Sequence, residues 1–150
     1  TGGSSDGSAR HHQSTMTARS SVRAYYDALR AGDALAPFFA REATPVKFGI
    51  GERLRGFEEI EAGLAEQTET TDGWVVDSDR LRVTERDGHA WFSDEVEMAW
   101  TDLGTGHRYE FDTRWSGTLE RRPSAESADT AAGTPWRFVG MHVSTPGGTR

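Results

Sequence analysis

Residues 88–100 read GHAWFSDEVEMAW, and this stretch decides the fold class. Apolar and polar side chains alternate along it, which is typical of a half-buried β-strand. The apolar face carries Ala90, Phe92, Val96, Met98 and Trp100. The opposite face carries Trp91, Ser93, Glu95 and Glu97. Asp94 has the phase of the apolar face, so we expect its carboxylate to find a hydrogen-bonding or ionic partner.

Strand signals continue on both sides of this stretch. Asp87 and Gly88 predict a hairpin turn before it, and Gly104 and Gly106 mark a turn after it. Residues 107–122 alternate again, with an apolar face of Tyr109, Phe111, Trp115 and Leu119. Two further strands are expected, over residues 74–84 and residues 136–145, which makes about four long strands in all. The first of these two has an irregularity near residues 77–79.

Helical spacing precedes the strands. Apolar residues recur at i, i+3, i+4 and i+7 in the set Val22, Tyr25, Tyr26 and Leu29. We expect Ser20 or Ser21 to cap this helix and Gly32 to end it. A short second helix around Pro37, a short strand over residues 46–50 and a third helix over residues 56–69 follow. Helices followed by hairpin-connected strands predict an α+β fold, in which a curved antiparallel sheet and its helices enclose an apolar cavity.

The composition limits the function classes. The chain has 150 residues, no cysteine and a net charge of −7, and Lys47 is the only lysine among 17 basic residues. One domain is expected, without disulfides, a thiolate zinc site or a cysteine nucleophile. Acid excess disfavours nucleic-acid and membrane partners, and we expect a cytoplasmic protein. Both a salt-rich cytoplasm and an arginine-favouring genome are compatible with this charge balance.

The two ends of the chain differ from the middle. Residues 1–17 are rich in Gly and Ser and predict a flexible tail, in which His11 and His12 are solvated. Residues 147–150 predict a second short tail, so the domain is expected to span residues 18–146. We expect no metal and no cofactor, because no metal-ligand spacing, phosphate-binding loop or dinucleotide motif is present in the sequence.

Five strings resemble one family when they are taken in order. They are VRAYYDALRAGD (22–33), APFFAREAT (36–44), RGFEEIEAGL (55–64), GHAWFSDEVEM (88–98) and WRFVGMHVSTP (136–146). Together they resemble the SnoaL-like branch of the nuclear transport factor 2-like superfamily. The last string also resembles the association domain of calcium/calmodulin-dependent kinase II. The resemblance implies a cone-shaped fold with three N-terminal helices packed on a curved, mainly antiparallel sheet, a pocket for a small organic molecule and a homodimer formed through the sheet.

The resemblance does not select one activity, because the superfamily holds isomerases, dehydratases, cyclases, hydrolases and binding or assembly modules. Similarity to the ketosteroid isomerase group places Tyr25 at the oxyanion-binding tyrosine and Lys47 near the position of the aspartate base. An ammonium cannot serve as that base. Asp94 is therefore the alternative acid/base, with Tyr25 orienting the substrate. The competing interpretation is structural: Asp94 pairs with Lys47 or an arginine, or caps a backbone group.

Binding and assembly are the other hypotheses. The residues expected to line a ligand pocket are Tyr25, Phe38, Phe39, Trp74, Phe92, Trp115 and Met141. Any of them can instead be ordinary core. The residues expected at a dimer contact on the polar sheet face are Trp91, Arg114, His142 and Ser144. A Ser/His/acid triad on that face is the less favoured interpretation, because a flat sheet offers no oxyanion hole. A third hypothesis is that the domain only dimerises.

Overall fold

The computed structural model describes residues 16–122 and 133–146. The predicted tail at residues 147–150 lies outside the described residues, as does the tail at residues 1–17 apart from its last two residues. The elements, in chain order, are α2 (Ala18–Ala31), the 3₁₀ helix η1 (Ala36–Phe38), β1 (Val46–Gly49), β2 (Glu52–Arg55), α3 (Gly56–Thr70), β3 (Thr71–Ser78), β4 (Arg82–Glu85), β5 (His89–Asp102), β6 (Arg108–Arg121) and β7 (Trp136–Ser144).

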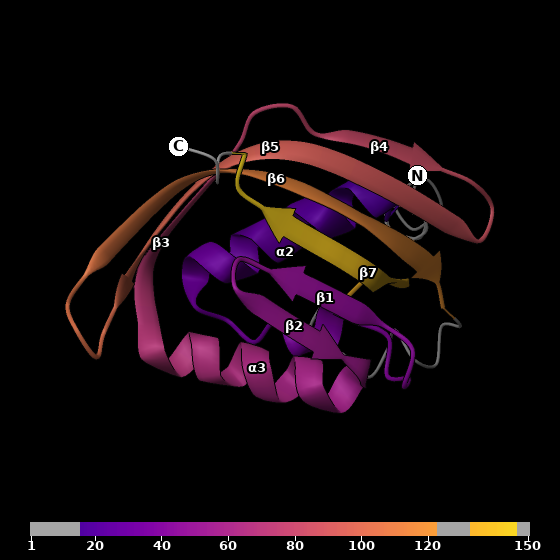
Figure 1. The fold of residues 1–150 in the computed structure, drawn as a ribbon. Helices are drawn as coiled ribbons and strands as arrows, with labels where there is room; N and C mark the ends of the chain where they lie inside the picture. Colours follow the sequence, from indigo (N-terminus) through magenta and orange to yellow (C-terminus); the bar gives the residue numbers. More distant parts are fainter. Residues whose placement is uncertain (1–15, 123–132, 147–150) are drawn as a thin grey trace, which may run out of the picture.

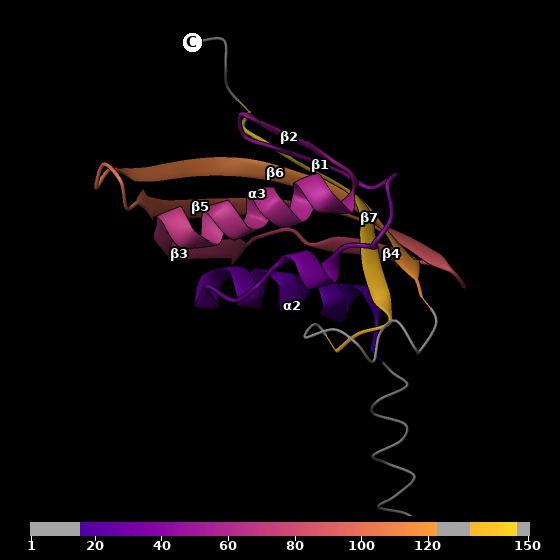
Figure 2. The same ribbon diagram turned by 90° about the horizontal axis from the view of Figure 1, so that it is seen from below.

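The strands form one seven-stranded sheet in the order β2-β1-β7-β6-β5-β3, and β4 also pairs with β5. All neighbours are antiparallel except β1 and β7, which run parallel. The sheet arches over α2, and α3 lies below the β1–β2 hairpin (Figure 1). Figure 2 looks onto the two helices from below, and thus onto the inner side of the sheet. The expected α+β fold is confirmed.

The helix count differs from the expected three. Residues 36–38 form only one turn of 3₁₀ helix, because Pro37 sits in its first positions and the chain is extended again at Phe39. The prediction that Ser20 or Ser21 caps the first helix is also wrong. Thr17 is the N-cap, and Thr17 and Ser20 bond each other's backbone N–H groups as a capping box. Gly32 ends α2, as predicted, and it adopts the left-handed conformation (φ 75°).

Two strand predictions need correction. The single strand expected over residues 74–84 is two strands, β3 and β4, which pair with successive parts of β5. Strand β2 has no counterpart among the predicted elements. It forms because Ile50 and Gly51 make a two-residue turn, in which Gly51 has a φ of 74°, and Gly49 then pairs with Glu52.

Most of the predicted apolar faces are buried, and Trp100, Tyr109 and Phe111 are half-buried. The inward side of α2 consists of Val22, Tyr25, Tyr26 and Leu29, and all four are buried. Along β5, the buried positions are Ala90, Phe92, Asp94, Val96, Met98 and Ala99. Arg30 binds the carbonyl oxygen of Val76 through both Nε and Nη2, which ties the end of α2 to β3. One core therefore joins the helices to the inner side of the sheet, and it leaves a cavity at one end.

Candidate functional site

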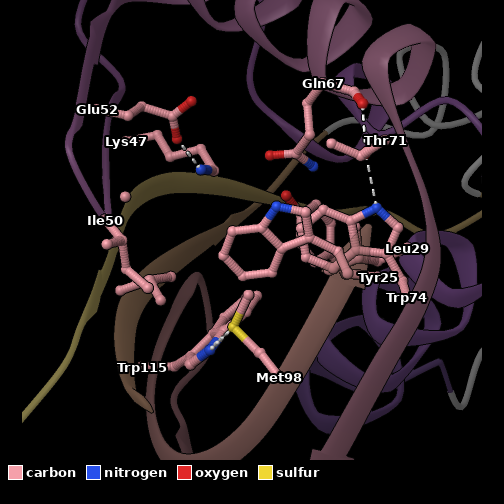
Figure 3. A pocket seen from close by; sticks show the side chains of 13 residues that line it. Tyr25, Leu29, Lys47, Ile50, Glu52, Gln67, Thr71, Trp74, Met98 and Trp115 are labelled. Atoms are coloured by element: carbon pink, nitrogen blue, oxygen red, sulfur yellow. Dashed lines mark hydrogen bonds and ion pairs between the residues drawn. The ribbon is translucent and has the colours of Figure 1, made fainter. Parts of the chain in front are cut away.

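A cavity of about 120 Å³ opens between α2, the turn after β1, the end of α3 and the inner side of the sheet (Figure 3). Its lining comes from every strand except β4. The lining residues are Tyr25, Leu29, Lys47, Gly49, Ile50, Glu52, Gln67, Thr71, Trp74, Met98, Trp100, Trp115 and Val143. An engineered apolar cavity of about 150 Å³ accommodates benzene. The size of this cavity, which is open to solvent, therefore suits a molecule of about one ring.

The walls of the cavity are aromatic and are held in place. Trp74 and Trp100 are stacked with their ring centroids 4.8 Å apart. The Trp74 indole N–H donates to Thr71 Oγ1 at 2.9 Å. The Trp115 indole N–H donates to Thr113 Oγ1 at 3.0 Å and lies 3.3 Å from the Met98 sulfur. These bonds fix two indole rings before any ligand binds, which lowers the entropic cost of binding a planar molecule.

Tyr25 supplies a polar group to this apolar site. The residue is 1% exposed, and its ring makes edge contacts with Phe38 and Phe138. Among the described residues, no hydrogen bond to its hydroxyl is found. Burial, and next the charge of Glu52, raise the pKa of Tyr25 far above its usual value. The phenol therefore keeps its proton and can donate it in a hydrogen bond to a ligand.

An ion pair lines the same cavity (Figure 3). The Lys47 ammonium donates to Glu52 Oε1 across the β1–β2 turn. The side chain of Lys47 is 7% exposed and that of Glu52 is 26% exposed, so the carboxylate is the end nearer to water. A Cβ atom at Gly49 would crowd Glu52 Oε1 and Lys47 Nζ. Glycine at this position therefore makes room for the pair.

Pairing with β7 explains why a lysine faces inward. Val46, Phe48 and Ile50 alternate in the sequence, yet Lys47 is buried while Phe48 is exposed. In the parallel pair, Lys47 lies beside Met141, which is an inward residue, and Phe48 lies beside His142 on the outside. The register with β7, and not the apolar pattern of β1, sets which side of the strand faces the cavity.

Asp94 lies outside the set of cavity-lining residues. Its carboxylate accepts hydrogen bonds from Tyr26 Oη at 2.8 Å, Ser78 Oγ at 2.6 Å and the Arg80 backbone N–H at 2.9 Å. The structure thus brings Asp94 to Tyr26 and not to Tyr25. Burial and then the Asp94 charge raise the pKa of Tyr26. The geometry is that of a buried carboxylate capping the backbone where β3 ends, which is one of the two structural interpretations given above.

The seven residues expected to line a pocket fall into two groups. Tyr25, Trp74 and Trp115 line the cavity. The other four pack in the core and do not line it: Phe38, Phe39, Phe92 and Met141. Sequence reasoning did not identify Trp100, Glu52 or Gln67 as site residues. Trp100 was detectable, because it shares the apolar face of β5, but Glu52 and Gln67 carry no sequence signal.

The residues expected at a dimer contact share the side of the sheet that faces away from the helices. We call this side, defined by Trp91, Arg114, His142 and Ser144, the outer face. Arg114 pairs in register with Glu95 and Ser144, and His142 pairs with Ser116. Trp91 is 44% exposed, although Arg86 and His89 pack on its ring. The four residues thus lie on one surface, outside the cavity.

Within residues 16–122 and 133–146, no three His, Asp or Glu side chains gather in a way that would hold a metal ion. None of the described helices is long and apolar enough to cross a membrane.

The fold and the cavity define an α+β domain with a helix-covered, arched sheet. The family model of the SnoaL-like domain matches residues 18–147, and the chain belongs to that family. No curated protein is significantly similar to the chain.

Solved structures support the same fold. A nuclear transport factor 2-like superfamily protein from Salmonella enterica serovar Typhimurium has a TM-score of 0.70 and 15% identity, and the match covers 87% of this chain and 89% of that one. A candidate dehydratase of the nuclear transport factor 2-like family from Streptomyces avermitilis has a TM-score of 0.69 and 16% identity, and the match covers 85% of this chain and 92% of that one. A candidate calcium/calmodulin-dependent protein kinase type II association domain from Thiobacillus denitrificans has a TM-score of 0.64 and 15% identity, and the match covers 87% of this chain and 96% of that one. At these identities the likeness concerns the fold alone.

Proposed function

We propose that this SnoaL-like domain binds a neutral, ring-sized organic molecule that carries a hydrogen-bond acceptor. The observation that supports this proposal most directly is the Tyr25 hydroxyl, which lies at the cavity and has no hydrogen-bond partner among the described residues. A ligand acceptor that bonds this hydroxyl contributes about 0.5–1.5 kcal/mol to binding. The indole rings of Trp74 and Trp115 contact the ring of the ligand.

The charges at the cavity favour a neutral ligand. Lys47 and Glu52 neutralise each other, so the site offers no uncompensated cation for an anionic ligand. The charge of Glu52 also raises the pKa of Tyr25, which means that negative charge is disfavoured at the phenol. A ketone, aldehyde or amide oxygen satisfies the donor without adding negative charge beside Glu52.

A matched pair of probes tests the binding proposal. Acetophenone has a ring and a carbonyl acceptor, whereas ethylbenzene has nearly the same shape without the acceptor. Three of the five tryptophans line the cavity, so tryptophan fluorescence reports on binding. One hydrogen bond is worth about 0.5–1.5 kcal/mol, so we expect acetophenone to bind roughly two- to tenfold more tightly than ethylbenzene. Tyr25→Phe should remove the difference. Failure of both probes to bind, or a preference that persists in Tyr25→Phe, would contradict the proposal.

An acid–base enzyme is the second candidate, and the Lys47–Glu52 pair beside Tyr25 favours it. A carboxylate can remove a proton next to a carbonyl group while a phenol stabilises the resulting enolate. Exchange of the acetophenone methyl protons in D₂O, followed by NMR, measures this step without knowledge of the substrate. We expect the protein to accelerate exchange and Glu52→Gln to abolish the acceleration. Exchange at the rate of buffer alone would leave binding as the function.

We also propose that the domain acts as a homodimer through the outer face. Exposed tryptophan is enriched at protein contacts, and Arg114, Ser144 and His142 offer polar groups at neighbouring positions of the same surface. A dimer that binds neither probe would favour the assembly-only alternative.

A further inference from the structure

The only lysine of the chain lies at the cavity. Sixteen of the 17 basic residues are arginines, and Lys47 is the exception. An arginine at this position would hold Glu52 by two parallel hydrogen bonds and would stay charged. Lysine differs in that it can lose its proton and become a nucleophile, and an apolar environment promotes this loss. Lys47 is therefore the one basic side chain in the sequence that can act as an amine nucleophile.

The neighbours of Lys47 supply the groups that amine chemistry with a carbonyl compound requires. Glu52 already accepts a hydrogen bond from the Lys47 ammonium, so it is placed to take the proton. Tyr25 lines the same cavity with a protonated hydroxyl that has no other partner among the described residues. Trp74 and Trp115 form apolar walls of the same cavity.

We propose that Lys47 captures an aldehyde or ketone in the cavity as an imine. This inference rests on the proposed binding function, because the carbonyl compound must first occupy the cavity. Glu52 takes a proton from the ammonium, and the free amine attacks the carbonyl carbon. The carbonyl oxygen, which is hydrogen-bonded by Tyr25, then takes a proton from the attacking nitrogen to give a neutral carbinolamine. Glu52 returns its proton to the carbinolamine hydroxyl, which leaves as water. The products are a protonated imine on Lys47, paired with the Glu52 carboxylate, and one water molecule, and no oxidant or reductant is consumed.

Reductive trapping tests the proposal. Benzaldehyde and cyanoborohydride convert an imine into a stable benzylamine, so the mass of the chain increases by one benzyl group and peptide mapping locates it. Arg53→Lys provides an internal control, because position 53 is exposed on the neighbouring strand and lies outside the cavity lining. Binding in the cavity holds benzaldehyde beside the Lys47 amine and the Glu52 carboxylate, so we expect Lys47 to be labelled at least about tenfold faster than the amine at position 53.

Lys47→Arg is the matched variant, because it keeps the positive charge and lacks the nucleophile. We expect it to lose the benzyl label that peptide mapping places at position 47. Labelling of Lys47 no faster than of position 53, or an unchanged label in Lys47→Arg, would overturn the inference. Quenching of the tryptophan fluorescence by benzaldehyde without trapping at Lys47 would refute the imine and leave the binding proposal standing. Absence of both quenching and trapping would refute both proposals.

Discussion

Tyr25 and Tyr26 are adjacent, buried tyrosines of α2 that differ in the partner of the hydroxyl group. Tyr26 donates a 2.8 Å hydrogen bond to the Asp94 carboxylate, whereas no partner of the Tyr25 hydroxyl is found in the described chain. Tyr26→Phe leaves buried Asp94 with two donors instead of three. Because a hydrogen bond to a charged group contributes about 1.5–3 kcal/mol, we expect Tyr26→Phe to lower the free energy of unfolding by about 2 kcal/mol. Tyr25→Phe breaks no such bond, and we expect a change of less than about 0.5 kcal/mol.

Urea unfolding followed by circular dichroism measures this contrast. With an m-value of about 2 kcal/mol/M, the midpoint should fall by about 1 M in Tyr26→Phe and stay nearly constant in Tyr25→Phe. Both variants keep the aromatic ring and its packing, so each serves as the control for the other. Equal losses in the two variants would refute the reasoning, because the Tyr25 hydroxyl would then have a stabilising partner. The same unfolding curve shows whether the Tyr25→Phe protein is folded. A folded Tyr25→Phe protein is a valid control in the binding experiment.

Three further outcomes are expected. Asp94→Asn should lower the free energy of unfolding by about 1–3 kcal/mol and leave the acetophenone affinity unchanged; a change in affinity at constant stability would place Asp94 at the site. Burial holds the pKa of Tyr25 and Tyr26 above the usual value near 10, so the unfolded chain loses their protons first and stability should fall as the pH rises above about 10. Replacing either tyrosine by Phe should make the free energy of unfolding fall less steeply, by up to about 1.4 kcal/mol per pH unit. If urea unfolding at alkaline pH gives the same pH dependence for the variant and the original protein, the role of that tyrosine is contradicted. Arg114→Ala should convert a dimer to monomer in light scattering, and an unchanged mass would remove Arg114 from the contact.

The sequence predicts those parts of the fold that local patterns encode. The alternation in β5 and β6 and the helical spacing in α2 each persist over many residues, so their faces are correct. The short elements are different. Strand β2 has the sequence ERLR, which has no strand-like apolar face, and it forms only because a tight turn places it beside β1. The three-residue η1 is too short for helical periodicity to define its type.

The site is less predictable than the fold, because its pairs depend on packing. Tyr25 and Tyr26 are about 100° apart around α2, and only the docking of the helix on β5 decides which one meets Asp94. Likewise, β1 gives no sign that Lys47 faces inward, since this follows from a parallel register with β7. Glu52 becomes a partner of Lys47 only through the turn at Ile50. Contacts between short, irregular segments leave no periodic trace in the sequence.

The parallel pairing of β1 with β7 has a consequence for hydrogen exchange. Only three residue pairs, from Val46↔Gly140 to Phe48↔His142, join the β1–β2 hairpin to the long strands of the sheet. Both hairpin strands have four residues, and β2 is the edge of the sheet. Such a unit opens at a lower free energy than the core, so its amides should exchange faster than those of β5 and β6. Each opening removes Lys47 and Glu52 from the cavity wall, so an occupied cavity should slow exchange first in the amides of β1.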